Sequence, residues 1–308
     1  MTQPSRDEQP GARPGRLGEP MIRSGVSPAA IRLGAVQYLN TKPLVHGLAA
    51  AGLTVRYDLP SRLADRLASG DLDVALIPTA ELLRGDGYRI VSDSCIGCRG
   101  PVMSVKLLFR TQPSKVLTLA VDEGSRTSAV LARILLAERF GVRPRVEPLP
   151  IGSGFGDTPA DAVLLIGDRA IRPAGGPADA SGGLVGSFQL AWDLGDEWCR
   201  WTSLPFVFAV WAARRGVDAA AVAPFLTAAR DAGRSNLAAI AAAEAAAHGL
   251  TVPQCLGYLR DNLHYDLGPR EWQAIRLFHR LGAALDLVPA TACDALQAAP
   301  ALLHGSLP

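Results

Sequence analysis

Short apolar runs alternate with amphipathic segments from Ile31 onward, and this alternation predicts a strand–helix repeat. The strands are expected at residues 31–39, 54–60 and 72–78. One helix is expected after Pro43, which lacks the amide hydrogen that a first helical turn leaves unused, and another with Ser61 as its N-cap. The last strand is almost continuously apolar, as in a strand buried on both faces. This βαβαβ order predicts a parallel sheet covered by helices.

A second strand–helix unit follows, so the pattern predicts two lobes. Further elements are expected as strands at residues 102–110, 115–121 and 162–167, and as a helix at 126–140 that ends at Gly141. After Trp192 the pattern turns helical. We therefore expect a disordered tail at residues 1–30, a first lobe from residues 31–111 and 189–308, and a second lobe from residues 112–188. Ligands of such an α/β protein bind at strand ends and helix N-termini, here in a cleft between the lobes.

Composition and charge narrow the class of protein. The 308 residues suffice for two domains of about 150 residues, and 48% of them are hydrophobic, which is too apolar for a disordered chain. The net charge of +2 argues against nucleic acid or an anionic membrane as partner. Residues 1–30 lack the apolar stretch of a secretory signal, and the most apolar run, at 201–213, is too short to span a membrane. We expect a cytoplasmic protein whose partner is a small molecule.

The turn Ser125-Arg126-Thr127-Ser128, between a predicted strand and a strong helix, is a candidate anion site. It combines three hydroxyls and a guanidinium with the free amides of a first helical turn, which suits a carboxylate or a phosphate. An ordinary N-cap would also use Ser or Thr. Capping needs fewer hydroxyls than this turn provides, so we favour the anion site.

Polar residues at other predicted strand ends extend the candidate site. Asn40 follows the first strand, and its amide can donate and accept hydrogen bonds at once, although Asn is also common in turns before helices. Ser104 starts the strand at 102–110, and Asp168 follows the strand at 162–167, either in the cleft or as a solvated carboxylate. Residues beside these that we also assign to substrate binding are Tyr38, Val105 and Gly167. Two of the three lysines, Lys42 and Lys106, lie in the same stretches.

Other motifs give little support for chemistry. Cys95 and Cys98 have the spacing of a redox or zinc pair, but the other cysteines are isolated and Arg-Gly-Pro follows instead of a helix. The total of five cysteines is odd, which argues against a disulfide framework. GSGFG at 152–156 is not a dinucleotide fingerprint, and neither a metal-ligand spacing of His nor a GxSxG motif occurs. No metal site is expected.

Six segments in order resemble the chorismate dehydratases of menaquinone biosynthesis by the futalosine pathway. They are YLNTKPL, GDLDVALIP, GPVMSVKLL, SRTSAVLARILL, AVLLIGD and WDLGDEWCRWTSLPFVFAVWAARR. The resemblance runs from Ile31 to the early 280s. The chain departs from the family pattern at two places, the short Gly-rich loop before residue 162 and Arg99. Neither place includes Asn40 or Ser104.

This resemblance implies a fold, a reaction and roles for residues. The family has the type 2 periplasmic-binding-protein fold, an α/β fold of two lobes with a ligand cleft between them. It converts chorismate to 3-[(1-carboxyvinyl)oxy]benzoate and water, a carbon–oxygen lyase reaction. By match to the family segments, Asn40 and Ser104 would be catalytic, and the turn from Ser125 to Ser128 would hold a substrate carboxylate.

The candidate residues offer no His and no paired carboxylates as general base. We hypothesise that the enolpyruvyl carboxylate of the substrate, held by Asn40, takes the proton from C3, and that Ser104 orients it or passes a proton to the leaving hydroxyl. Asp168 is the alternative base. Aromatisation drives the elimination, so no metal or organic cofactor is implied. Two other functions stay open: the sister enzyme 1,4-dihydroxy-6-naphthoate synthase, and a non-catalytic protein that binds a small anion.

Overall fold

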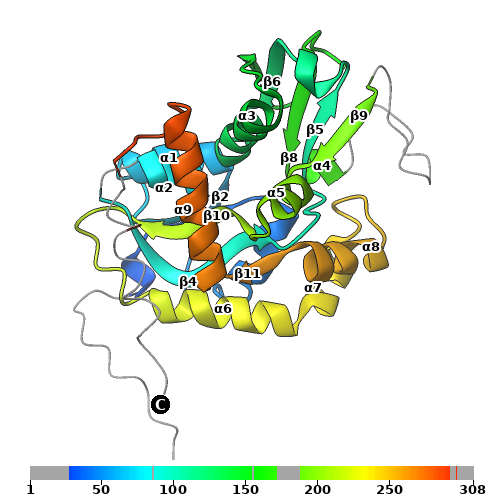
Figure 1. Cartoon of the computed structure of the whole chain (residues 1–308). Helices are drawn as coiled ribbons and strands as arrows, with labels where there is room; N and C mark the ends of the chain where they lie inside the picture. The colour runs from blue at the N-terminus through cyan, green and yellow to red at the C-terminus, as the bar shows by residue number, and fades with distance from the viewer. Residues whose placement is uncertain (1–27, 85–86, 155, 172–187, 292–295, 297–308) are drawn as a thin grey trace, which may run out of the picture.

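The computed structural model describes residues 28–84, 87–154, 156–171, 188–291 and 296, which form two sheets with helices around them (Figure 1). The larger sheet has the strand order β11-β4-β10-β3-β1-β2. Its strands are β1 (Leu33–Val36), β2 (Val55–Asp58), β3 (Val74–Pro78), β4 (Arg89–Cys98), β10 (Phe206–Ala213) and β11 (His264–Asp266). β1 pairs in parallel with β2 and β3, as the βαβαβ pattern predicts, whereas β10 and β11 pair antiparallel with β4.

The smaller sheet has the strand order β7-β6-β8-β5-β9. Its strands are β5 (Val105–Phe109), β6 (Thr118–Asp122), β7 (Arg145–Leu149), β8 (Ala162–Ile166) and β9 (Leu190–Asp193). β6 pairs in parallel with β7 and β8, and β5 pairs antiparallel with β8 and β9. This sheet lies at the upper right of Figure 1, beside the helix α3.

Helices cover both sheets. The α-helices are α1 (Pro60–Ala68), α2 (Thr79–Arg84), α3 (Thr127–Phe140), α4 (Asp168–Ile171), α5 (Leu194–Thr202), α6 (Ala223–Ser235), α7 (Leu237–Glu244), α8 (Val252–Gly257) and α9 (Pro269–Ala284). Shorter turns are the 3-10 helices η1 (Pro28–Ala30), η2 (Leu39–Val45) and η3 (Pro113–Lys115), and the π-helix η4 (Tyr258–Asn262). As predicted, α3 ends at Gly141, which has the left-handed φ of 67°. In the described part of the chain, no helix has the length and apolar character needed to cross a bilayer.

The structure corrects the predicted start of two helices. The segment after Pro43 is not an α-helix, because Pro43 lies inside the 3-10 helix η2 and the chain leaves it at His46 in an extended conformation. Helix α1 starts at Pro60 with Leu59 as its N-cap, so Ser61 is inside the helix. The fixed φ of proline suits the first helical position, and this decides where α1 begins.

The region after Trp192 is also not uniformly helical. It contains β10, which is buried along its whole length between β3 and β4 in the middle of the larger sheet. A short, continuously apolar run has no period that distinguishes a buried strand from a buried helix, so only its neighbours could assign it.

Two parts of the predicted first lobe pair instead in the smaller sheet, so their assignment is wrong: residues 102–110 contain β5, which lies between β8 and β9, and the segment that starts at residue 189 begins with β9 itself. The chain therefore passes from the larger sheet to the smaller one before β5 and returns before β10. The outer limits of the lobes stay a prediction. Of the expected tail, residues 1–27 lie outside the described residues and Pro28–Ala30 form a 3-10 turn, and the predicted loop at 172–183 also lies outside them.

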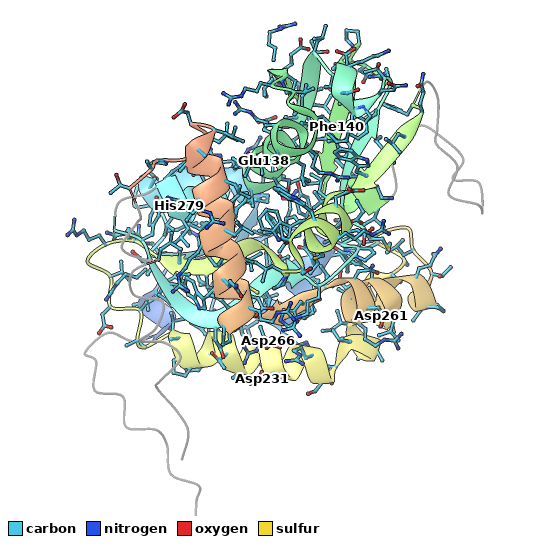
Figure 2. All side chains as sticks on the ribbon, viewed as in Figure 1. Glu138, Phe140, Asp231, Asp261, Asp266 and His279 are labelled. Carbon is cyan, nitrogen blue, oxygen red and sulfur yellow. The ribbon has the colours of Figure 1, made fainter. Side chains whose placement is uncertain are left out.

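Apolar side chains from both sheets pack into one core, whose largest fully buried members include Trp198, Trp211 and Trp272. A smaller apolar cluster contains Leu108 from β5 and Val163 from β8. Exposed charged side chains such as Glu138 on α3 and Asp231 on α6 lie at the outside of the molecule (Figure 2). Contacts between apolar side chains in this shared core hold the two sheets together.

Candidate active site

A cavity of about 510 Å³, measured out to its mouth, lies where the ends of strands from both sheets meet. This volume is within the range of small-molecule sites. Of the residues predicted for the site, those that line it are Tyr38, Asn40, Ser104, Val105, Ser125, Arg126, Thr127, Ser128 and Gly167. The rest of the wall is apolar and includes Val36 from β1, Ile166 from β8 and Phe208 from β10. Asp168 is not part of the wall.

Two hydroxyls at this cavity are buried without a hydrogen-bond partner among the described residues, those of Tyr38 and Ser125. Both side chains belong to residues only 7% exposed. Burial, together with the negative charges of Asp122 and Asp168, raises the pKa of Tyr38 well above its usual value, so the phenol keeps its proton at neutral pH. A buried hydrogen-bond donor without an acceptor lowers the stability of the folded protein. The two hydroxyls are therefore suited to donate to an anion in the cavity.

The N-terminus of α3 adds further donors at the same end of the cavity. Its N-cap residue Arg126 makes no side-chain capping bond, and the helix is 14 residues long, so its first turn brings unpaired amides and the positive end of the helix dipole. The preceding turn is fixed by Asp122, whose carbonyl accepts from the Ser125 amide at 2.8 Å and whose Oδ1 accepts from the Gly124 amide at 3.0 Å. These contacts hold Ser125 at the cavity wall.

Two side chains of the predicted anion turn are engaged elsewhere. The Arg126 guanidinium donates to Asp65 of α1 at 2.7 Å and to Glu81 of α2 at 2.9 Å, so it connects α3 to these two helices. The Thr127 hydroxyl donates to the Phe208 carbonyl at 3.0 Å and accepts from the backbone amide of Ala80 at 3.1 Å. The candidate groups for binding an anion are thereby reduced to Tyr38, Ser125, Ser128 and backbone amides.

Gly167 joins the two sides of the cavity. Its amide donates to the Ser104 carbonyl at 2.8 Å, and its φ of 63° is in the left-handed region that favours glycine. A Cβ at this position would lie 2.7 Å from the ring of Tyr38. Only glycine therefore allows the end of β8 to approach Tyr38 and Ser104 this closely.

Ser104 is held by a strained turn. It is 1% exposed, and the residue before it, Met103, has a φ of 67°, which is uncommon for a residue with a side chain. Asp193 accepts from the Val102 amide at 2.9 Å and from the Met103 amide at 2.6 Å while also capping α5 through the amides of its first turn. Asp193 thus stabilises the turn that presents Ser104.

Asn40 lies opposite in η2 and is 9% exposed, and its Oδ1 accepts from the Thr41 hydroxyl at 3.3 Å. A residue that the sequence analysis missed, Tyr258, lies near Asn40 and Ser104 but outside the cavity wall. Burial raises the pKa of its hydroxyl well above the usual value, and the side chains of Ser104 and Asn40 partly offset this rise. Nothing in the amphipathic pattern of residues 253–262 marks this tyrosine, because only the packing of η4 brings it beside the site.

Asp168 makes a connection between the lobes. Its Oδ1 accepts from the Leu39 amide at 3.2 Å, and its Oδ2 lies 3.1 Å from Nδ1 of His248, a second residue that the sequence analysis missed. Burial raises the pKa of Asp168, and the neighbouring His248 partly offsets this rise. His248 also approaches Glu244 at 3.4 Å, and Lys42 forms an ion pair with Glu244 at 2.9 Å. Lys42 is therefore not part of the cavity wall.

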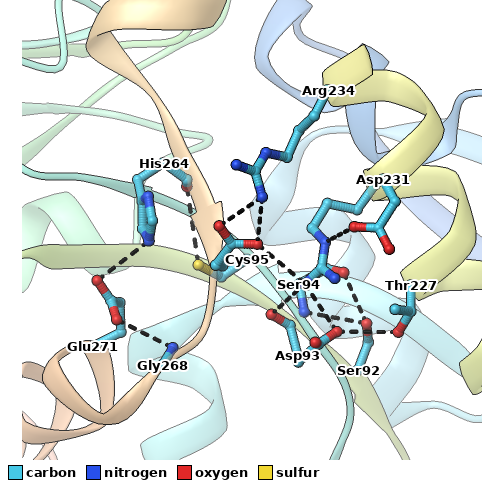
Figure 3. Close-up of polar contacts among 12 residues, drawn as sticks. Ser92, Asp93, Ser94, Cys95, Thr227, Asp231, Arg234, His264, Gly268 and Glu271 are labelled. Atoms are coloured by element: carbon cyan, nitrogen blue, oxygen red, sulfur yellow. Dashed lines mark hydrogen bonds and ion pairs between the residues drawn. The ribbon is translucent and has the colours of Figure 1, made fainter. Parts of the chain in front are cut away.

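A second polar cluster lies away from the cavity, between β4 and α9 (Figure 3). Glu271, 1% exposed, accepts from Arg99 at 3.0 Å and from the Gly268 amide at 3.1 Å, and lies 3.3 Å from His264. The side chain of Arg99, one of the departures from the family pattern, thus stabilises the start of α9. Cys95 and Cys98 are buried in β4, and burial raises the pKa of the Cys95 thiol. In the part of the chain that the structure describes, no three His, Cys, Asp or Glu side chains are grouped to hold a metal ion.

Solved structures of binding proteins share the fold of this chain. The alkanesulfonate-binding protein SsuA from Xanthomonas axonopodis pv. citri, bound to MOPS, matches with a TM-score of 0.59 at 15% identity, over 86% of this chain and 96% of that protein. A Candida albicans protein described as having the generic periplasmic binding protein fold matches with a TM-score of 0.53 at 13% identity, over 87% of this chain and 93% of that protein. These likenesses confirm the predicted two-lobe fold and, at such identities, the fold alone.

Sequence comparisons are more specific. The chain is 32% identical over 259 residues to the chorismate dehydratase of Thermus thermophilus, a match that covers 80% of this chain and 93% of that protein. A family model described as menaquinone biosynthesis matches residues 31–284, the range over which the six segments resemble that family. The chain therefore belongs to the menaquinone-biosynthesis family.

Proposed function

We propose that this protein dehydrates chorismate to 3-[(1-carboxyvinyl)oxy]benzoate in the biosynthesis of menaquinone. The name of the Thermus relative and the family match support the substrate and the reaction. The observation that carries the proposal is the composition of the cavity wall. It brings Asn40 and Ser104 together with two unpaired hydroxyl donors, while none of its described residues is a His, Asp, Glu, Lys or Cys. Such a wall can bind an anion and orient it, but it offers no ordinary general base.

Chorismate carries two carboxylates, and the cavity has two polar ends that suit them. The end formed by Tyr38, Ser125 and the first turn of α3 would take the ring carboxylate, because it gathers unpaired donors and a helix N-terminus. The end formed by Asn40 and Ser104 would take the enolpyruvyl carboxylate, which the Asn40 amide can hold as a donor. Hydrogen bonds to a charged acceptor are stronger than neutral ones, so both ends contribute to binding and orientation.

The elimination then proceeds with the substrate as its own base. The enolpyruvyl carboxylate takes the proton from C3, and the charge that develops is conjugated with the ring carboxylate, where Tyr38 and Ser125 donate to it. The C4–O bond breaks, the hydroxyl leaves with a proton that Ser104 delivers from the newly formed carboxylic acid, and the ring becomes aromatic. One proton and one hydroxyl leave as water, so no electron carrier takes part in this step.

The position of Asp168 supports this assignment over a protein base. Its two oxygens are already in contact with the Leu39 amide and with His248, and it is outside the cavity wall. We therefore assign Asp168 to holding the lobes together beside Asn40. We place the activity in the cytoplasm, as expected from the sequence, and cell fractionation with an antibody against the chain tests this.

The test of the proposed function is incubation of the purified full chain with chorismate, with and without EDTA, followed by absorbance and mass spectrometry. We expect an aromatic product lighter than chorismate by one water, formed equally with EDTA, and absent in Asn40→Ala. Chorismate returned unchanged by a folded wild-type protein would contradict the proposal. Retention of bound, unreacted chorismate would then indicate a binding protein, and turnover of the sister enzyme's substrate would indicate that activity.

A further inference from the structure

The turn that leads into Ser104 has an unusual backbone. In this turn of three residues, the Ser104 amide donates to the Val102 carbonyl at 2.8 Å, and the central residue, Met103, has a φ of 67°. A γ-turn with a positive φ at its centre is rare and strained. Strained backbone persists only where the surrounding structure holds it, and it is concentrated at functional sites. The groups that hold this turn are therefore of interest for the reaction.

The side chain that holds the turn is Asp193, at the end of β9. One of its oxygens, Oδ1, accepts from the Val102 amide at 2.9 Å, and the other, Oδ2, accepts from the Met103 amide at 2.6 Å. Because β9 pairs with β5, which starts directly after Ser104, the backbone of Asp193 is fixed by the same sheet (Figure 1). Oδ1 also accepts from two amides in the first turn of α5, at 3.0 and 3.1 Å. Both oxygens of this carboxylate thus fix the position of the turn relative to β9 and α5.

The loop before the turn is also closely packed. A Cβ added to Gly195, in the first turn of α5, would lie 2.8 Å from the Gly100 carbonyl and 3.0 Å from the Cβ of Val102. Helix α5 therefore lies directly against this loop. The side-chain amide of Asn262 in η4 donates to the Pro101 carbonyl at 2.9 Å. The loop is thus held before it reaches its strained turn.

We infer that Asp193 is a positioning residue that holds the γ-turn in the shape that presents the Ser104 hydroxyl to the substrate. Asp193 is not among the residues that line the cavity, so it acts through Ser104. The Ser104 hydroxyl lies 3.5 Å from the Val102 carbonyl, which is too long for a strong hydrogen bond, so the backbone turn decides where the hydroxyl points. This inference rests on the proposed function, since it assigns a role in the same reaction.

The first test is Asp193→Asn, which changes one contact of the carboxylate. With its oxygen in the place of Oδ1, asparagine still accepts from Val102 and still caps α5, since Asn is among the best N-cap residues. Its Nδ2 then faces the Met103 amide, so two donors replace a hydrogen bond. We expect kcat to fall by about 10- to 100-fold, because Ser104 delivers a proton in the elimination, while KM for chorismate changes by less than about threefold. An unchanged kcat in a folded Asp193→Asn protein would overturn the inference.

Asp161→Ala is the matched control for stability. Oδ2 of Asp161 accepts from the backbone amides of Leu117 and Thr118, both at 2.9 Å, so this carboxylate too holds two successive amides. Asp161 precedes β8, whereas Gly167 and the cavity lie at the other end of that strand. Its replacement should lower the melting temperature at least as much as Asp193→Asn does and keep kcat within about twofold. Equal losses of kcat in the two variants would show that lost stability explains both, and the inference would be wrong.

A double-mutant cycle tests whether the effect of Asp193 passes through Ser104. If it does, Asp193→Asn lowers the rate by less than about threefold when Ser104 is already alanine, because the group that it positions is gone. A full additional loss in that background would show that Asp193 acts elsewhere.

Two substitutions of Met103 keep the inference testable if Asp193→Asn does not fold or Ser104→Ala has no measurable rate. Glycine adopts a positive φ freely, whereas valine, which is branched at Cβ, does so rarely. Both keep the backbone amide that donates to Asp193, and glycine removes more of the side chain. Met103→Gly should therefore retain a kcat at least about fivefold higher than that of Met103→Val, at similar KM. Equal values, or the reverse order that a loss of side-chain volume would give, would contradict the role of the turn.

The proposed function and this inference fail in distinguishable ways. If wild-type protein does not convert chorismate, the proposed function is wrong and the variants have no starting rate. If wild-type protein is active and Asp193→Asn matches it, the function stands and the inference is wrong.

Discussion

Replacing Tyr38 by phenylalanine removes a hydroxyl that is buried at the cavity without a partner among the described residues. The ring remains, with its contacts to Gly167, so the change is confined to one donor. In the free protein this donor contributes no intramolecular hydrogen bond, and an unsatisfied buried donor costs about 1–3 kcal/mol. We therefore expect Tyr38→Phe to leave the free energy of unfolding unchanged or to raise it by up to about 1 kcal/mol, which corresponds to a rise of about 2–4 °C in Tm.

The same change has the opposite effect on binding. A hydrogen bond from a neutral donor to a carboxylate contributes about 1.5–3 kcal/mol, so its loss weakens chorismate binding by about 10- to 150-fold. Since the ring carboxylate also carries charge in the transition state, kcat/KM should fall by at least as much as affinity. A variant that is as stable as wild type and binds substrate poorly is the expected result.

Thermal melts with and without chorismate, combined with steady-state kinetics, measure both effects. Tyr265→Phe is the control, because its hydroxyl has a partner in the Leu259 carbonyl at 3.2 Å. It should lower the free energy of unfolding by about 1 kcal/mol and leave KM unchanged. If Tyr38→Phe destabilises the free protein as Tyr265→Phe does and binds chorismate like wild type, the assignment of Tyr38 as a free donor for the substrate is refuted.

Three further predictions concern other parts of the structure. Gly167→Ala should lower the free energy of unfolding by about 2–4 kcal/mol and abolish turnover, because residue 167 has a positive φ and an added Cβ would lie 2.7 Å from the Tyr38 ring. Gly141→Ala is the control, since Gly141 also has a positive φ but open space around it. Chemical denaturation should show a loss of only about 1 kcal/mol for this control. Asp168→Asn should reduce kcat by less than about tenfold, since Asp168 joins the lobes and is not the base; complete loss of turnover with chorismate binding and folding intact would contradict substrate-assisted proton transfer. Burial alone would raise the pKa of Glu271, but the nearby His264 ring and hydrogen bonds from a backbone amide and from Arg99 lower it from 4.5 to about 2. Because the folded-state pKa is depressed, this carboxylate stabilises the protein above about pH 5 and loses up to about 3 kcal/mol as the pH falls towards 2, and the pH dependence of unfolding should be flatter in Glu271→Gln.

Local patterns were sufficient for part of the fold and of the site. The parallel β1–β3 unit, the helix α3 and its end at Gly141 depend on apolar periodicity and on residues that start or stop a helix, which act over a few positions. The turn before α3 was recognisable as a candidate anion site for the same reason, since unpaired amides at a helix start follow from the helix itself. The sequence also pointed to Asn40 and Ser104, through segments that resemble a family, and both line the cavity.

The tertiary structure decided the rest, because partners distant in the chain determine it. An apolar run such as β10 is a strand only once β3 and β4 lie on either side of it. Arg126 and Thr127 have the chemistry to bind an anion, yet Asp65, Glu81 and the Phe208 carbonyl occupy them. The Ser125 hydroxyl in the same turn has no partner among the described residues. Tyr258 comes to lie near Asn40 and Ser104 only through the packing of η4. The sequence by itself determined which segments could form a site, and long-range packing determined which of their polar groups remain free to act, because a hydrogen-bonding group is available only where the fold brings it no other partner.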